Sequence, residues 1–117
     1  MRAWAVACGL LCLTTSNGLA QTEDQSKALR SAAYATMLAD RCPLWIVNVT
    51  SLNILLAIHD IAAADVGVGG KYDAAITTMM SEFDVEAANL EAEYACLAAE
   101  LLYGPRGTDR PNLMRRR

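Results

Sequence analysis

YDAAITTMMSEFDVEAANLEAEYACLAAELLY, residues 72–103, is the most periodic stretch of this 117-residue sequence. Its apolar side chains are spaced three and four residues apart throughout, which places them on one face of an α-helix in a bundle or coiled coil. This apolar stripe consists of Ile76, Met79, Met80, Phe83, Ala87, Leu90, Tyr94, Leu97 and Leu101. Gly104 and Pro105 follow and end the helix. The stretch therefore predicts a single long helix of about 48 Å.

Two further helices are predicted before this stretch. Residues 23–41 begin after Thr22, a good N-cap in a capping-box pattern, and they end before Pro43. Residues 44–66 carry large apolar side chains on all sides and stop at the glycine-rich loop 67–70. A helix that is apolar all round is covered all round, so residues 44–66 are expected to form the central, most buried helix. This helix spans about 34 Å, so the last turns of the longer helix project beyond it or pack on something else.

Together these segments predict an all-α protein, either a three-helix up-down-up bundle or a helical hairpin with a long C-terminal helix. The composition agrees, because 54% of the residues are hydrophobic, only 6% are aromatic and 21 are alanine. The strands of β-sandwiches and barrels use β-branched and aromatic residues, so these folds are disfavoured. The length suits one domain, which we place at residues 21–104.

Alanines form a regular stripe on the first and on the third predicted helix. Both stripes have spacings of four, three and four residues: Ala28, Ala32, Ala35 and Ala39, then Ala88, Ala92, Ala95 and Ala99. Small side chains let two helices approach closely, so we expect these two helices to run parallel and in contact. The alternative is that the regular spacing arises by chance, because alanine is abundant in this chain.

Residues 1–20 have the pattern of a cleavable export signal. Arg2 is followed by an apolar run that is too short to span a bilayer, and Gly18 and Ala20 supply the small residues before a cleavage site. A lipoprotein signal at Cys8 or Cys12 is the weaker alternative. The protein is therefore expected to be exported, to the periplasm or outside the cell.

Removal of the export signal leaves Cys42 and Cys96 as the two cysteines of the exported protein. Because exported proteins meet an oxidising compartment, we predict a disulfide bond between them. Two free thiols or an intermolecular bridge are the alternatives. Neither cysteine has other cysteines or histidines at metal-ligand spacing.

Charge is divided unevenly along the chain. Residues 21–104 contain 4 basic and 12 acidic residues, a net charge of −8, whereas residues 105–117 contain 5 arginines and Asp109, a net charge of +4. Pro105, Gly107 and Pro111 break regular structure, so residues 105–117 are predicted to be a flexible, arginine-rich tail. An acidic body disfavours nucleic acid as a partner. The tail could contact an anionic membrane surface, an acidic protein or a neighbouring copy.

Residues that would support catalysis or metal binding are few. His59 is the one histidine, and its neighbour Asp60 would point about 100° away from it on a helix. No nucleophile or phosphate-binding motif accompanies them, so we predict no enzyme activity, no cofactor and no metal site. Asn48, Val49 and Thr50 form a glycosylation sequon inside a predicted apolar helix, and its meaning depends on the type of organism.

In a three-helix domain only two companion helices surround the central helix and cannot easily cover it on all sides, so apolar surface is expected to remain exposed and to bind a partner. The candidates for this surface are Trp45, Val49, Leu52, Leu56, Leu101, Leu102 and Tyr103. The leading hypothesis is an exported helical protein that acts by protein–protein interaction, as a homodimer or as an accessory, inhibitor or immunity-type subunit in the cell envelope. The alternative is a carrier of a small apolar ligand, bound between the helices near Met37, Trp45, Met79 and Phe83.

Overall fold

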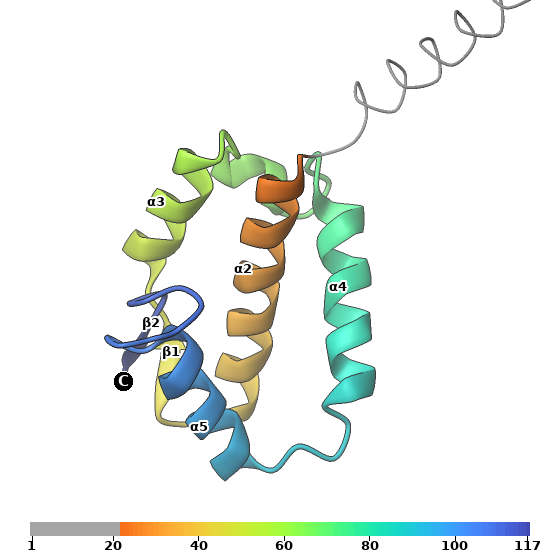
Figure 1. Ribbon diagram of the computed structural model, residues 1–117. Helices are drawn as coiled ribbons and strands as arrows, with labels where there is room; N and C mark the ends of the chain where they lie inside the picture. Colours follow the sequence, from red (N-terminus) through yellow and green to blue (C-terminus); the bar gives the residue numbers. More distant parts are fainter. Residues whose placement is uncertain (1–21) are drawn as a thin grey trace, which may run out of the picture.

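The computed structural model describes residues 22–117, and the predicted export signal lies outside these residues. The described part of the chain is mostly helical and contains one short pair of strands (Figure 1). In chain order the elements are α2 (Glu23–Arg41), β1 (Trp45–Val47), α3 (Val49–Ile58), the 3₁₀ helix η1 (Ala63–Val66), α4 (Asp73–Glu86), α5 (Ala92–Tyr103) and β2 (Met114–Arg116). None of the helices in residues 22–117 is both long and apolar enough to cross a membrane.

Helix α2 is the centre of the molecule. Figure 1 shows it between α3 and α4, and α5 also packs against it. It buries Ala28, Leu29, Ser31, Ala33, Ala35, Met37 and Leu38. The predicted bounds are confirmed: Gln25 N donates to Thr22 Oγ1 and Thr22 N donates to Gln25 Oε1, which completes the capping box.

The prediction of one central helix over residues 44–66 is wrong. The segment instead contains β1, the ten-residue helix α3 and η1, and α3 buries only Leu55 and Leu56. The β-branched and aromatic residues of β1 pair with β2, and the Asn48 side chain then accepts a hydrogen bond from Ser51 N and starts a new helix. Asp60, with a φ of 58°, ends the helical path, because acidic and amide residues tolerate this left-handed backbone conformation.

The predicted long helix of residues 72–103 is divided into α4 and α5. Residues 87–91 form a turn, in which Leu90 N donates to Ala87 O over 2.9 Å. The chain then reverses, so that α5 runs opposite to α2: Cys96 meets Cys42 at one end, and Tyr103 meets Tyr34 further back along α2. The parallel arrangement expected for the first helix and this part of the chain is therefore wrong.

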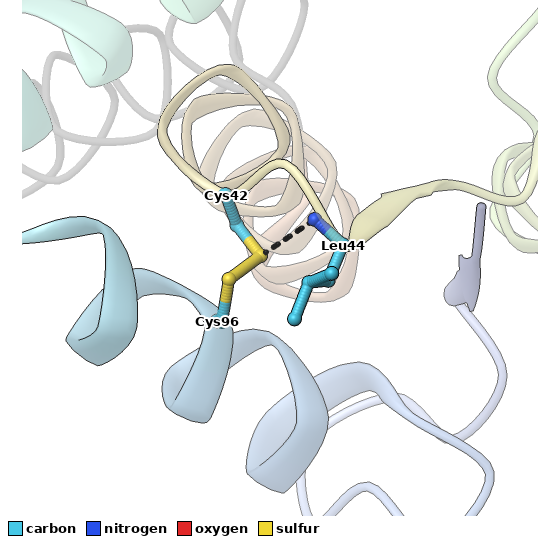
Figure 2. Close-up of a disulfide and its surroundings, with 3 residues drawn as sticks. All are labelled: Cys42, Leu44 and Cys96. Atoms are coloured by element: carbon cyan, nitrogen blue, oxygen red, sulfur yellow. Dashed lines mark hydrogen bonds between the residues drawn. A yellow bond between two sulfur atoms is a disulfide. The ribbon is translucent and has the colours of Figure 1, made fainter.

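The predicted disulfide between Cys42 and Cys96 is confirmed (Figure 2). It joins the end of α2 to the first half of α5, with the two Cα atoms 5.0 Å apart, and Leu44 N donates to the Cys42 sulfur over 3.4 Å. Beside it, Ala95 and Ala99 are completely buried, whereas the other two alanines of the same predicted stripe, Ala88 and Ala92, are exposed. Close packing through alanine is thus confined to the last two positions of this stripe.

The structure does not support a flexible tail over residues 105–117, because this segment folds back onto the molecule. Its strand β2 pairs antiparallel with β1, with Met114 opposite Val47 and Arg116 opposite Trp45. Leu113 is 2% exposed and Met114 is 1% exposed. Two apolar residues thus anchor a segment whose proline, glycine and arginine content indicated a solvated end.

Gly107 explains how the chain turns back after α5. A Cβ atom at this position would overlap the carbonyl oxygen of Leu102, so only glycine fits. Asn112 adopts a φ of 66° just before Leu113, a conformation that asparagine tolerates better than most residues. The turn therefore depends on residue types that sequence analysis ordinarily associates with loops.

Candidate functional site

An exposed apolar row on α5 is a candidate partner-binding surface. Tyr94, Leu97 and Leu101 lie at positions i, i+3 and i+7 of the helix and are 54%, 50% and 56% exposed. Leu44, 48% exposed, borders a shallow hollow of about 300 Å³ that Leu97 also lines. We call these four residues together the α5 face.

Charged groups of both signs border the α5 face. Glu93 and Glu100 of α5 line the same hollow as Arg116 of β2. The guanidinium carbon of Arg116 lies 5.5 Å from the centre of the Trp45 ring, which forms the floor of the hollow and is 4% exposed. Within residues 22–117 neither glutamate forms an ion pair, so their charges are available to a partner.

The structure separates the residues that the sequence assigned to a partner surface. Val49 of α3 is 63% exposed and Leu101 of α5 is 56% exposed, on two different helices. Leu52 and Leu102 are half-buried, and the remaining three, Trp45, Leu56 and Tyr103, belong to the core. Leu101 is therefore the one predicted residue that lies in the α5 face.

Sequence analysis missed Leu44, Tyr94 and Leu97. The last two were assigned to the buried stripe of one long helix, and the turn at residues 87–91 rotates them to the outside. One sequence signal did point to their exposure: the predicted helix over residues 72–103 was longer than the helix over residues 44–66 that was expected to cover it. No pattern in the sequence marked Leu44 as a surface residue.

An apolar groove lies on the other side of α2, between α3 and α4. It has a volume of about 280 Å³ and is lined by Ala32, Ala33, Thr36, Leu52, Leu56, Val66, Ile76 and Met80. The residues predicted to line a ligand pocket do not meet there. Met37 and Met79 are buried in the core, Trp45 lies under the hollow of the α5 face, and Phe83 lines a different pocket.

The pocket that Phe83 lines is polar and lies where α2, α4 and residues 105–117 meet. On its wall the Ser31 hydroxyl donates a hydrogen bond of 2.9 Å to Asp109 Oδ2. Burial, together with the charge and hydrogen bonding of Asp109, raises the pKa of the Tyr103 hydroxyl well above its usual value, so this phenol stays neutral at physiological pH. We call this cavity the basic pocket, because Lys27, Arg30 and Arg110 line it together with a single acidic residue, Asp109.

His59 lies away from the basic pocket. It caps the end of α3, and its carbonyl oxygen accepts a hydrogen bond of 2.8 Å from the Gln25 side chain. Asn48, the first residue of the sequon, uses its side-chain oxygen to cap the start of α3. Across residues 22–117, no three histidine, cysteine, aspartate or glutamate side chains are placed so as to hold a metal ion.

No protein-family model, curated protein or solved structure matches this chain.

Proposed function

We propose that this protein acts by binding rather than by catalysis, and that two copies associate through the α5 face. The observation that carries the proposal is the row of Tyr94, Leu97 and Leu101, which exposes about half of each side chain next to Leu44. Contiguous exposed apolar groups on a small protein mark an interaction surface, because leaving them in water costs free energy. Burial against a partner recovers that free energy.

The charges around the α5 face favour a second copy of this chain as the partner. In a two-fold dimer each copy presents the same surface to the other, so that surface must be self-complementary. Glu93 and Glu100 on α5, and Arg116 on β2, offer both signs of charge around one apolar centre. A two-fold rotation can place the glutamates of one copy next to the arginine of the other.

The proposal includes export, to the periplasm or the cell exterior. The export pattern of residues 1–20 and the Cys42–Cys96 disulfide support an oxidising compartment. The α5 face would also suit an accessory, inhibitor or immunity-type subunit if it binds a different envelope protein in place of a second copy. Self-association is the part of the proposal that can be tested with the purified protein alone.

Sedimentation velocity over a range of protein concentrations tests the dimer. We expect a dimer for the wild type and a monomer for Leu97→Asp, since a buried carboxylate in the interface is costly. Val85→Asp is the matched control, because Val85 is 79% exposed on α4 and lies outside the α5 face. A wild-type protein that stays monomeric at millimolar concentration, or a dimer that survives Leu97→Asp, would contradict the proposal.

A second candidate function is the transport of a small apolar ligand in the groove between α3 and α4. Seven of its eight lining side chains are apolar, and Met80 and Leu52 are only half-buried. Such a groove matches the lower end of ligand-site volumes, about 300 Å³. Titration with the neutral dye phenylnaphthylamine tests it. Binding that Met80→Glu removes, and that Ser81→Glu on the exposed side of α4 leaves intact, would favour the carrier.

A further inference from the structure

The basic pocket concentrates positive charge on an otherwise acidic molecule. Residues 21–104 contain four basic residues against twelve acidic ones, and two of those four, Lys27 and Arg30, line this one pocket. Arg110, from the segment that folds back, adds a third cation. Asp109 is the one acidic residue among the residues that line it. The residues that line the pocket therefore carry a net positive charge, in contrast to the net charge of −8 on residues 21–104.

The acidic residues near the pocket leave these cations available. Lys27 lies 3.6 Å from Glu23 and Arg30 lies 4.0 Å from Glu82, and all four side chains are more than half exposed. Exposed pairs of this kind contribute little, because water screens them. Asp109 would repel an anion, but it already accepts a hydrogen bond from Ser31. Its charge is thus partly compensated by the wall of the pocket.

Arg110 supplies a donor that has no partner. In the described part of the chain its Nε is the one buried side-chain nitrogen or oxygen without a hydrogen-bond acceptor. A buried, unsatisfied donor costs free energy, and most such groups in folded proteins are paired. No ion pair within residues 22–117 involves the Arg110 guanidinium, so its charge is available to a ligand in the pocket that it lines. Arginine also has the fork geometry that matches carboxylate and phosphate groups.

An aromatic wall stands beside these cations. The rings of Tyr34 and Phe83 are 4.9 Å apart between centroids, and the guanidinium of Arg30 lies 5.4 Å from the centre of the Phe83 ring. The pocket has a volume of about 310 Å³, which suits a small molecule rather than a macromolecule. A planar or apolar ligand body can stack against the Tyr34 and Phe83 rings while its charged group faces the arginines.

We infer that the basic pocket binds a small organic oxyanion, with its charged group at Arg30 and Arg110 and its apolar part against Tyr34 and Phe83. The shared chemistry is an oxyanion next to an aromatic or apolar body, as in an aromatic carboxylate or an organic phosphate. This inference does not depend on the dimer, because the pocket and the α5 face share no lining residue. The two can therefore fail or succeed separately.

Isothermal titration of the disulfide-bonded protein with four probes tests the inference: benzoate, phenyl phosphate, inorganic phosphate and neutral benzyl alcohol. We expect benzoate or phenyl phosphate to bind at least tenfold more tightly than benzyl alcohol and inorganic phosphate. The stronger of the two anionic ligands identifies the oxyanion. No measurable binding of either aromatic anion, equal binding of benzyl alcohol, or equal binding of inorganic phosphate would overturn the inference.

Variants locate the binding site. Arg110→Gln is expected to weaken the affinity about tenfold or more, as for the loss of one charge-assisted hydrogen bond. Arg30→Gln, at an exposed position that should not disturb folding, is the second variant and should weaken binding in the same direction. Arg106→Gln, on the returning segment but outside the pocket, is the matched control. Unchanged affinity in Arg30→Gln and in folded Arg110→Gln would overturn the assignment. Leu97→Asp should bind the probe as the wild type does.

Discussion

At the scale of single residues, Cys42 is buried at the end of α2 and bonded to Cys96, 54 residues further along the chain. Closing a loop of this length restricts the unfolded chain and stabilises the fold by about 4 kcal/mol in the chain-entropy model. We therefore expect the double variant Cys42→Ala and Cys96→Ala to lose about 2–4 kcal/mol of unfolding free energy in urea denaturation. Reduction of the wild type should give a similar loss, and equal stability of the oxidised and reduced proteins would contradict a structural role for the bond.

Tyr103 gives a second residue-scale prediction, about alkaline pH. Its pKa is raised in the folded protein by burial and by Asp109, whereas an unfolded tyrosine loses its proton near pH 10. Above about pH 10 the unfolded state therefore binds fewer protons than the folded state, and the unfolding free energy falls as the pH rises. Below that pH both states are protonated, and the contribution is fully present.

Urea denaturation between pH 8 and pH 11 measures this effect. Tyr103→Phe cannot ionise at this position and should lose less stability over that interval than the wild type. Asp109→Asn removes one of the causes of the shift, so it should lower the pKa of Tyr103 in an ultraviolet phenolate titration. Identical pH profiles for the wild type and Tyr103→Phe would show that Tyr103 does not titrate differently in the two states.

At the scale of elements, β2 and the buried Leu113 just before it hold residues 105–117 on the molecule, and Met114 of β2 is also buried. Truncation of a buried methionine leaves a cavity, so Met114→Ala should lower the unfolding free energy by about 2–4 kcal/mol. Arg115→Ala, at the adjacent exposed position, should stay within about 0.5 kcal/mol. Urea denaturation of the two variants compares them directly. If residues 105–117 were a flexible tail, both substitutions would leave the stability unchanged.

The elements that could be predicted from the sequence are those with local signals. Helix α2 has its capping box at Thr22 and ends before Pro43, and both signals lie within the helix or next to it. The pairing of β1 with β2 brings together residues 67 to 71 positions apart, and no pattern in a short window reports such contacts. Because β2 provides a pairing partner, the β-branched residues of β1 form a strand rather than part of a helix.

The break between α4 and α5 shows a different limit. Apolar residues at helical spacing continue through residues 87–91, so periodicity alone predicts one helix. The chain turns there because Cys96 and the buried alanines Ala95 and Ala99 pack on α2 in the opposite direction. The disulfide could be predicted by counting cysteines, whereas the direction of the helix that carries it could not.

At the scale of the whole molecule, the candidate sites depend on how distant segments meet. The basic pocket combines α2, Phe83 of α4, Tyr103 of α5 and the segment around Arg110. Sequence analysis assigned the arginines after residue 104 to a solvated tail, so Arg110 was not connected with Arg30. The α5 face required the turn at residues 87–91, and its charged border required the strand that carries Arg116. The basic pocket could not be found before the return of residues 105–117 was known.

The proposed dimer makes a prediction about pairs of variants. If Glu93 and Glu100 of one copy meet Arg116 of the other, Glu93→Lys/Glu100→Lys places like charges at both symmetric contacts, and Arg116→Glu does the same with the opposite sign. Each variant alone should then sediment as a monomer. An equimolar mixture should form a one-to-one dimer, because the new lysines of one chain meet the new glutamate of its partner. The second contact in that mixed dimer keeps its original glutamates and arginine.

Arg115→Glu is the matched control for this charge exchange. Arg115 neighbours Arg116 in β2, and adjacent strand residues point to opposite faces, so its side chain lies away from the hollow that Arg116 lines. Arg115→Glu should dimerise as the wild type does and should not rescue Glu93→Lys/Glu100→Lys. Sedimentation velocity of the mixtures separates the outcomes: restoration by Arg116→Glu alone identifies the contact, whereas restoration by both variants would mean that net charge, rather than a two-fold contact at the α5 face, controls association.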